Sequence, residues 1–359
     1  MMDKGKKVFV GVSGGVDSSV ALYLLKKAGF DVTGVFIRTW QPDWIECTWR
    51  EERRDAIRVC AHLGVPFLEC DLEERYKKDV ADYMVSEYKK GRTPNPDVMC
   101  NKEVKFGGFL DFAIKHGADF IATGHYAQVI QNNGVFELHK SVDAEKDQSY
   151  FLWTLSQKEL KHVLFPIGHL TKKEVRKIAE KAKLHTATKK DSQGICFLGK
   201  IPMKDFLSHF IEEKEGKVLN EKGEEIGSHP GALFFTLGER HGFLITKKGP
   251  DDKPYYVIKK DIEKNTLIVS NDPLTAADVV EMANQSIGIE SLHFISDKAT
   301  EGHIYQVRSR YRQKTVSAYI NQFNNEAEVA LIDAKLIAPS GQSLVIYDGT
   351  RCVGGGIVK

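Results

Sequence analysis

The sequence predicts an α/β protein with a doubly wound parallel sheet, then a small β-rich central domain, and then a C-terminal β-barrel. Two observations favour this class. In the first part of the chain, short apolar runs alternate with segments whose apolar residues recur at helical spacing. After about residue 200, this spacing gives way to runs that alternate apolar and polar residues. We expect domains at residues 1–200, 201–275 and 276–359.

The first domain is expected to alternate strands and helices. Its apolar runs predict strands at residues 7–12, 31–40, 66–72 and 119–126, and its helical spacing predicts helices at residues 18–30, 51–65 and 106–118. This alternation favours parallel pairing with right-handed crossovers. Further along, Ser156 with Glu159 and Thr171 with Glu174 each fit a capping box, so each pair predicts a helix start.

The later part of the chain is expected to be mostly β-structure. Residues 217–227 predict a hairpin with Gly223 in its turn. Residues 303–320 and 328–339 alternate apolar and polar side chains, and residues 340–358 place turn residues between strands. Such closely spaced strands predict a small β-barrel at the C-terminal end.

Composition and charge limit the class of protein. The chain has 359 residues, of which 42% are hydrophobic and 28% charged, as in soluble globular proteins. No apolar run is long enough to span a bilayer, and no signal peptide precedes the first strand, so we expect a cytoplasmic protein with no membrane partner. The formal net charge is only +2, so a nucleic-acid partner must be argued from local patches.

The cysteines give no indication of a structural metal site. They are Cys47, Cys60, Cys70, Cys100, Cys196 and Cys352. None forms a CxxC pair, so we expect no bound structural metal, and a reducing cytosol would keep the cysteines as thiols. Cys60 is expected in a helix core and Cys352 in a barrel turn. Cys47 lies in QPDWIECTW, which is either a mobile active-site loop or an ordinary surface loop.

A Gly/Ser-rich loop lies between the first expected strand and helix, with the sequence Ser13-Gly14-Gly15-Val16-Asp17-Ser18. Glycines allow backbone N–H groups to surround an anion, and the N-terminus of the following helix also favours negative charge. The loop fits neither a Walker motif nor a dinucleotide fingerprint. Without the Walker lysine, it is suited to holding pyrophosphate rather than to transferring a γ-phosphoryl group. The alternative is a simple turn in which Asp17 caps the helix.

Two further motifs contain cysteines. In TPNPDVMCN, residues 93–101, the two prolines exclude a helix across the segment and predict a rigid loop that presents Asp97 near Cys100. A carboxylate near a thiol can move protons while sulfur reacts. In KKDSQGICFLG, residues 189–199, the two lysines favour a thiolate at Cys196. Alone, the first motif is equally consistent with an incidental cysteine in a turn, and the second favours a buried cysteine beside Ile195 and Phe197.

The motifs together resemble a known family. SGGVDS is similar to the PP-loop of the ATP-pyrophosphatase superfamily, whose sheet is of the adenine nucleotide alpha hydrolase type. TPNPDVMCN, GHYAQV, KDQSYFLW, KKDSQGICFLG, RYRQ and GQSLVIYDG follow in order. This series resembles the tRNA-specific 2-thiouridylase family over nearly the whole chain.

The resemblance implies an enzyme that uses ATP, with Mg²⁺ expected, to adenylate O2 of the wobble uridine in tRNA. A persulfide sulfur then replaces the activated oxygen, and AMP and pyrophosphate are released. It implies the tRNAs for Lys, Glu and Gln as substrates, and a cysteine desulfurase or sulfur-relay protein as the sulfur donor.

The resemblance also implies roles for residues. Cys196 would carry the persulfide, Cys100 would help to release the sulfur and leave a Cys100–Cys196 disulfide, and Asp97 would act as acid and base. The implied ATP-binding residues are Gly11, Val12, Ser13, Gly14, Gly15, Val16, Asp17, Ser18, Ile37 and Gly124. The implied tRNA-binding residues are Asn95, Pro96, Asp97, His125, Lys146, Asp147, Gln148, Arg310, Tyr311 and Gln342. Ile37 departs from the family, which commonly has Met there.

Two basic clusters are compatible with RNA. Residues 172–190 contain eight basic and two acidic side chains, and a second cluster consists of Arg308, Arg310, Arg312 and Lys314 with interleaved tyrosines. Phosphate contacts and base stacking fit such surfaces. Either cluster alone would favour a solvated face over an RNA surface.

The alternative functions are those of a nucleotide amidotransferase, a 4-thiouridine synthase, a non-catalytic RNA-binding protein and an RNA methyltransferase. We find no glutaminase half and no segment that resembles a methyl-donor site.

Overall fold

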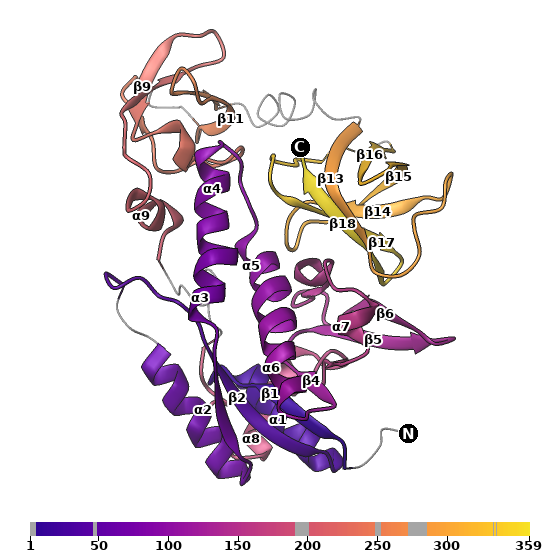
Figure 1. Ribbon diagram of the computed structural model, residues 1–359. Helices are drawn as coiled ribbons and strands as arrows, with labels where there is room; N and C mark the ends of the chain where they lie inside the picture. Colours follow the sequence, from indigo (N-terminus) through magenta and orange to yellow (C-terminus); the bar gives the residue numbers. More distant parts are fainter. Residues whose placement is uncertain are drawn as a thin grey trace.

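The computed structural model describes residues 5–45, 49–190, 201–247, 253–271, 286–332, 334 and 336–359. Its N-terminal part contains a parallel sheet with the strand order β3-β2-β1-β4-β7 (Figure 1). The strands are β1 Lys7–Gly11, β2 Asp31–Arg38, β3 Phe67–Asp71, β4 Phe120–Ala122 and β7 Val163–Leu164. All neighbouring pairs are parallel, as the strand–helix alternation predicted.

Helices cover both faces of this sheet because its strands are apolar on both sides. Val8 and Val10 of β1 pack into a core with the helices α1 Val16–Ala28, α2 Trp49–Leu63 and α8 Lys172–Lys181. Phe9 points to the other face and packs with η2 Cys100–Gly108 and α6 Phe109–Lys115. The doubly wound prediction is therefore confirmed.

The strand order reverses between β1 and β4, because β2 and β3 lie on one side of β1 and β4 and β7 on the other. Open α/β sheets bind ligands beyond the carboxyl ends of strands at such a switch point. The Gly/Ser-rich loop follows β1 directly, so it lies where this class of sheet places its ligand.

The segment with two prolines forms a helix start, which the sequence did not predict. Helix α5 Pro96–Met99 begins at Pro96 and continues into the π-helical turns of η2. The expectation of a rigid loop across residues 93–101 was wrong, because a proline at the first helical position removes only an N–H that has no intrahelical partner. The preceding helical segments are α3 Glu73–Tyr76, η1 Lys77–Asp82 and α4 Tyr83–Lys89.

The central part is an antiparallel-rich sheet with the order β10-β9-β8-β12-β11. Its strands are β8 Gly216–Leu219, β9 Glu225–His229, β10 Leu244–Ile245, β11 Tyr256–Asp261 and β12 Thr266–Ser270. β8 and β9 form the predicted hairpin, and Gly223 in its turn has φ +81°. Short helical segments α9 Met203–Ser208 and η4 Ala232–Phe234 accompany the sheet.

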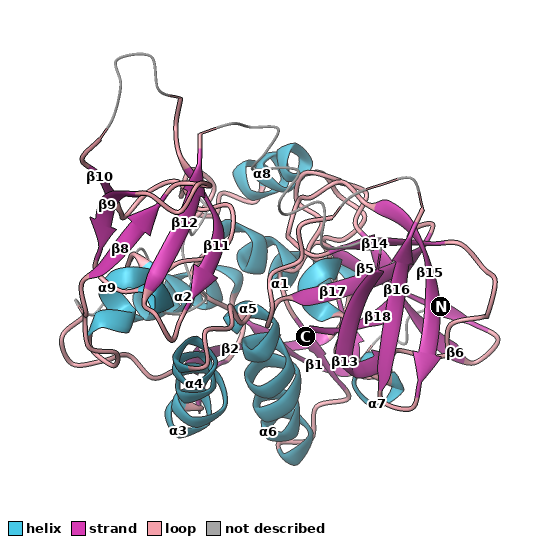
Figure 2. Cartoon of the chain, turned by 90° about the horizontal axis from the view of Figure 1, so that it is seen from above, coloured by secondary structure: helices cyan, strands magenta, loops and turns pink. Residues whose placement is uncertain are grey.

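The C-terminal strands close into the predicted barrel, since β13 pairs with both β16 and β18. They are β13 Ser286–Phe294, β14 Tyr305–Arg308, β15 Val316–Phe323, β16 Glu326–Leu331, β17 Ser343–Asp348 and β18 Arg351–Val358. Cys352 is buried within β18 and not in a turn, because the chain turns earlier, at Gly349 with φ +61°. Figure 2 shows the central sheet and the barrel on opposite sides of α5.

One hairpin joins the first part of the chain to the barrel. β5 Ala127–Asn132 pairs with β6 Val135–Lys140, and β6 pairs with β18. The sequence pattern did not predict this hairpin. The segment after it contains η3 Ser149–Leu152 and α7 Gln157–Leu160. Both predicted capping boxes are present, at the starts of α7 and α8. No helix in the described part of the chain has the length and apolar character needed to cross a membrane.

Candidate active site

The Gly/Ser-rich loop is ordered by bonds among its own residues. The hydroxyls of Ser18 and Ser19 donate to the Gly15 carbonyl at 3.2 and 2.7 Å, and the Ser13 N–H donates to Ser18 Oγ at 3.3 Å. Gly14 has φ +70°, and a Cβ there would lie 2.5 Å from the Glu52 carbonyl oxygen, so glycine is required. These contacts hold the loop at the N-terminus of α1 in a form that suits an anion.

The other expected nucleotide-binding residues lie at neighbouring strand ends. A Cβ at Gly11 would contact Ile37 Cδ1 at 3.7 Å, so the ends of β1 and β2 meet there. A Cβ at Gly124, beyond β4, would lie 2.6 Å from the Ser18 backbone nitrogen. The structure thus brings Gly11, Ile37, Gly124 and the loop together around one switch point.

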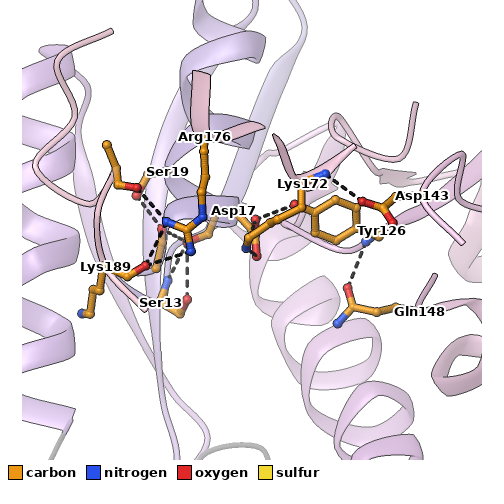
Figure 3. Close-up of polar contacts among 12 residues, drawn as sticks. Ser13, Asp17, Ser19, Tyr126, Asp143, Gln148, Lys172, Arg176 and Lys189 are labelled. Atoms are coloured by element: carbon orange, nitrogen blue, oxygen red, sulfur yellow. Dashed lines mark hydrogen bonds and ion pairs between the residues drawn. The ribbon is translucent and has the colours of Figure 1, made fainter. Parts of the chain in front are cut away.

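Asp17 does not cap its helix, since it makes contacts beyond the loop (Figure 3). Both of its carboxylate oxygens accept hydrogen bonds from Lys172 Nζ at 2.8 Å, and the Tyr126 hydroxyl donates to Oδ1 at 2.8 Å. The Lys172 side chain is only 13% exposed. Asp17 and Lys172 therefore form a mostly enclosed ion pair beside the loop.

Two more basic side chains lie on the other side of the loop, near Ser13 in Figure 3. Lys189 Nζ donates to the Gly14 carbonyl at 3.0 Å and to Asp55 at 2.7 Å. Arg176 donates to the backbone carbonyl of Lys189 at 3.2 Å. Burial opposes ionisation of Asp55, but its hydrogen bond and ion pair with Lys189 hold its pKa below the usual value. Three cations of the basic segment 172–190, namely Lys172, Arg176 and Lys189, therefore lie beside the loop. This segment does not face solvent alone.

Expected tRNA-contact residues gather around the start of α5. The Asn95 side chain caps the helix by accepting from the Val98 N–H at 3.2 Å. Gln342 Nε2 donates to the Pro94 carbonyl at 3.3 Å. From the central part, Thr236 Oγ1 lies 3.2 Å from Thr93 Oγ1. All three parts of the chain thus meet at this helix start.

The two residues of this segment that are expected to take part in the chemistry differ in exposure. Asp97 is half-buried in the first turn of α5, and Cys100 is fully buried at the start of η2. Cys196, the expected partner of Cys100, and Cys47 lie outside the described residues. Next to Cys100, Asn101 Nδ2 donates to the Phe151 carbonyl at 3.2 Å, and the Phe151 ring lies 4.8 Å from that of Tyr311. Phe151 therefore contacts both the cysteine-bearing turn and the Tyr311 ring.

Some expected RNA contacts are occupied inside the protein. Asp147 is 3% exposed, forms an ion pair with Arg308 at 2.8 Å, and accepts from Ser149 Oγ at 3.0 Å. Arg308 is itself 6% exposed and donates to the Tyr347 hydroxyl at 2.7 Å. These two side chains form a polar core between the first domain and the barrel, so the RNA surface expected from the second basic cluster does not include Arg308.

The remaining expected contacts are only partly available. His125 is 7% exposed, its Nδ1 lies 2.7 Å from Thr123 Oγ1, and burial lowers its pKa well below the usual value. Gln148 Oε1 accepts from the Tyr126 N–H at 2.9 Å. Arg310 donates to the Leu237 carbonyl at 2.9 Å. The Lys146 backbone N–H bonds to the Asp143 carbonyl.

A carboxylate beside the loop is suited to a metal ion that binds together with nucleotide phosphates. Among the described residues, no group of three or more His, Cys, Asp or Glu side chains is arranged to hold a metal ion. Mg²⁺ in nucleotide sites commonly uses one or two protein carboxylates together with substrate phosphates. Asp17 beside the loop fits that donor set.

Comparisons with known proteins identify the family of the chain. The chain is 41% identical over its whole length to the tRNA-specific 2-thiouridylase MnmA of Streptococcus thermophilus, covering 96% of that protein. It is 43% identical, again over its whole length and 96% of the relative, to the protein of the same name from Staphylococcus saprophyticus. The chain belongs to the tRNA-specific 2-thiouridylase family.

Domain-level matches follow the same three-part order in this family member. Residues 6–200 match the family described as tRNA methyl transferase HUP domain, residues 204–271 its PRC-barrel domain, and residues 284–358 the aminomethyltransferase beta-barrel domain. A solved 4-thiouridine synthetase–RNA complex with ATP is 23% identical, with a TM-score of 0.35 over 55% of this chain and 46% of that one.

Proposed function

We propose that the chain converts the wobble uridine of tRNA to 2-thiouridine at the expense of ATP. The observation that carries this proposal is identity above 40% with relatives of that name over the full chain. The ordered loop at the switch point supports the ATP step, because it presents a helix N-terminus to an anion. The α5 start supports the sulfur step, because it places a carboxylate and a thiol one helical turn apart.

The reaction is proposed in two stages. O2 of the uridine attacks the α-phosphorus of ATP, and pyrophosphate leaves, so that the oxygen becomes part of a good leaving group. The terminal sulfur of a Cys196 persulfide then attacks C2, and AMP departs with the oxygen. Bound Mg²⁺ would neutralise phosphate charge, and Asp17 is the residue beside the loop that would hold it. Asp97 is proposed to accept and return the proton that moves during sulfur transfer.

Release of the thiolated base is assigned to Cys100. Its thiolate attacks the Cys196 sulfur, the persulfide bond breaks, and the electron pair remains with the sulfur on C2. The enzyme is left with a Cys100–Cys196 disulfide, which a dithiol reductant must reduce before the next turnover. Because Cys100 is fully buried, we propose that the π-helical turn at η2 rearranges when RNA binds.

The substrates and location follow from the same proposal. We propose the tRNAs for Lys, Glu and Gln as substrates, a cysteine desulfurase or sulfur-relay protein as the donor to Cys196, and the cytoplasm as the site of action. The side chains of Asn95 and Gln342, which contact the α5 start, and of Tyr311, which packs near Phe151, are the proposed wall against which the target base lies.

A second function is suggested by the wording of the domain matches, which includes methyl transferase. Mass spectrometry of tRNA treated with the purified protein separates the two. With ATP and a persulfide donor, we expect a mass gain for replacement of oxygen by sulfur at the wobble uridine, and none with the Cys196→Ser variant. Transfer of an isotopically labelled methyl group from a methyl donor, without thiolation, would overturn the proposal.

A further inference from the structure

The loop lacks the lysine that phosphate-binding loops of the Walker type carry in their own sequence. A lysine from another helix lies beside it. Lys172, the first residue of α8, reaches Asp17 in the first turn of α1, and both Nζ–oxygen distances are 2.8 Å. We propose that Lys172 is the phosphate-binding cation of this site, and that it contacts the β- or γ-phosphate of ATP. This inference rests on the proposed ATP-dependent function.

Lys172 occupies a position that is electrostatically unfavourable for a cation, which a purely structural role would not explain. The first turn of a helix carries partial positive charge, which disfavours a cation there. The side chain is also mostly enclosed, with 13% exposure. Asp17 offsets both costs by accepting from the ammonium group through both carboxylate oxygens. Placing a cation here is unfavourable unless negative charge lies close by. The position therefore suits a side chain that binds a negatively charged ligand next to the helix N-terminus.

The lysine is held in place on three sides. Its backbone N–H donates to Asp143 at 2.8 Å, and its Nζ lies 5.8 Å from the centre of the Tyr126 ring. Tyr126 is 2% exposed and donates to the same Asp17 carboxylate at 2.8 Å. Helix α8 packs directly against α1. The backbone of Lys172 is therefore fixed, and its ammonium group stays close to Asp17, as Figure 3 shows.

The ion pair with Asp17 implies that the site has two arrangements, one without nucleotide and one with nucleotide bound. When Lys172 turns to a phosphate oxygen, Asp17 loses its bonds to the ammonium group, and Oδ2 becomes available to a divalent cation while Oδ1 still accepts from Tyr126. The pair therefore keeps the two charges balanced when no nucleotide is bound. Lys189 and Arg176 are bonded differently. Lys189 donates to the Gly14 carbonyl and to Asp55, and Arg176 donates to the Lys189 carbonyl, so these two side chains support the other side of the loop.

The test compares the affinities of the full chain for ATP and AMP by calorimetry in the presence of Mg²⁺. We expect Lys172→Met to weaken ATP binding by about tenfold or more and AMP binding by less than about twofold, because AMP lacks the β- and γ-phosphates. Lys172→Arg, which keeps the charge, should restore part of the ATP affinity. The neighbouring Lys173 is exposed, so Lys173→Met is the matched control and should bind both nucleotides like the wild type.

The outcomes separate this inference from the function on which it rests. If the wild type binds no ATP, the proposed function fails. If the wild type binds ATP and Lys172→Met binds it equally well, only the inference is overturned. An equal loss of ATP and AMP affinity in Lys172→Met would show that the lysine merely ties α8 to α1, and this result would also overturn it. A melting temperature recorded for each variant shows whether the protein is folded during the measurement.

Discussion

The loop at residues 13–18 and the helix start at residues 95–100 are stabilised by different kinds of contacts. The loop is ordered by contacts within the first domain, from Ser18 and Ser19 to Gly15 and from Lys189 to Gly14. The helix start depends on distant segments, since Ser340 accepts from the Thr93 N–H at 2.8 Å and Gln342 donates to Pro94. The difference suggests that nucleotide binding belongs to the first domain, whereas sulfur transfer depends on the assembled chain.

The largest expected effect separates the two regions. We expect Cys100→Ser to reduce thiolation by about a thousandfold or more, because it removes the proposed nucleophile that releases the product. ATP affinity should remain unchanged, since Cys100 lies on η2 and not in the loop. Liquid chromatography with mass spectrometry of the tRNA and calorimetry with ATP measure the two effects.

Cys60→Ser is the control for this substitution. Cys60 is also buried, at 1% exposure, but lies in α2. If Cys60→Ser lost as much activity as Cys100→Ser, the loss would reflect a buried hydroxyl and not the chemistry of Cys100. Substantial thiolation by Cys100→Ser would contradict its assigned role.

A second prediction concerns the connection between the helix start and the barrel. Arg92 forms ion pairs with Glu87 at 2.9 Å and with Glu290 of β13 at 2.6 Å. Because Glu87 is 7% exposed and would keep its ion pair with Lys90 at 2.8 Å, Arg92→Met should lower the free energy of unfolding by about 2 kcal/mol. Thiolation should fall while ATP affinity is kept.

Urea unfolding and ATP calorimetry measure these effects, and Arg53→Met is the control. Arg53 pairs with Glu69 on the surface, where both side chains are 37% exposed, so its loss should change the stability by about 1 kcal/mol or less. Equal loss of ATP binding and thiolation in Arg92→Met would show that the two regions are not independent.

The third prediction tests the close packing of the loop. A Cβ at Gly124 would lie 2.6 Å from the Ser18 nitrogen and 2.8 Å from the Asp17 carbonyl carbon. Gly124→Ala must displace backbone at the start of α1, which typically costs about 1–3 kcal/mol, so ATP affinity should fall by about tenfold. Gly288→Ala in β13 is the control, because its Cβ would meet only Lys359 at 3.4 Å. Unchanged ATP affinity in Gly124→Ala would contradict the assigned packing.

The sequence predicted features that depend on local residue patterns and missed those that depend on contacts between distant segments. The loop, the capping boxes and the hairpin at Gly223 depend on local residue patterns, and the structure has them as expected. The helix at Pro96 was missed because proline is favourable at a first helical position and unfavourable elsewhere. The direction in which Lys172 points was also missed, since a basic helix face has the same sequence pattern whether it faces solvent or Asp17. Likewise, the burial of Arg308 with Asp147 depends on a contact between residues far apart in the sequence.

The smallest expected effect concerns the central part, which contacts the helix start through Thr236. Nearby, Lys260 donates to the Phe235 carbonyl at 3.0 Å, and burial lowers the pKa of Lys260 to about 8. An unfolded lysine has a pKa of about 10.4, so the unfolded state binds more protons between these values and stability should rise with pH across that window. Lys260→Met removes this contribution, and the wild type should gain about 1 kcal/mol relative to the variant between about pH 7.5 and 9.5.

The difference between the two proteins is the quantity to measure, because other groups titrate in the same range. Burial raises the pKa of Cys60 to about 11, which opposes the effect of Lys260 as the pH rises. This opposing contribution is common to the wild type and Lys260→Met and therefore cancels. Urea unfolding at both pH values gives the comparison. A constant difference in stability would mean that Lys260 is solvated, and the central part would then be less firmly packed beside Thr236 than the structure indicates.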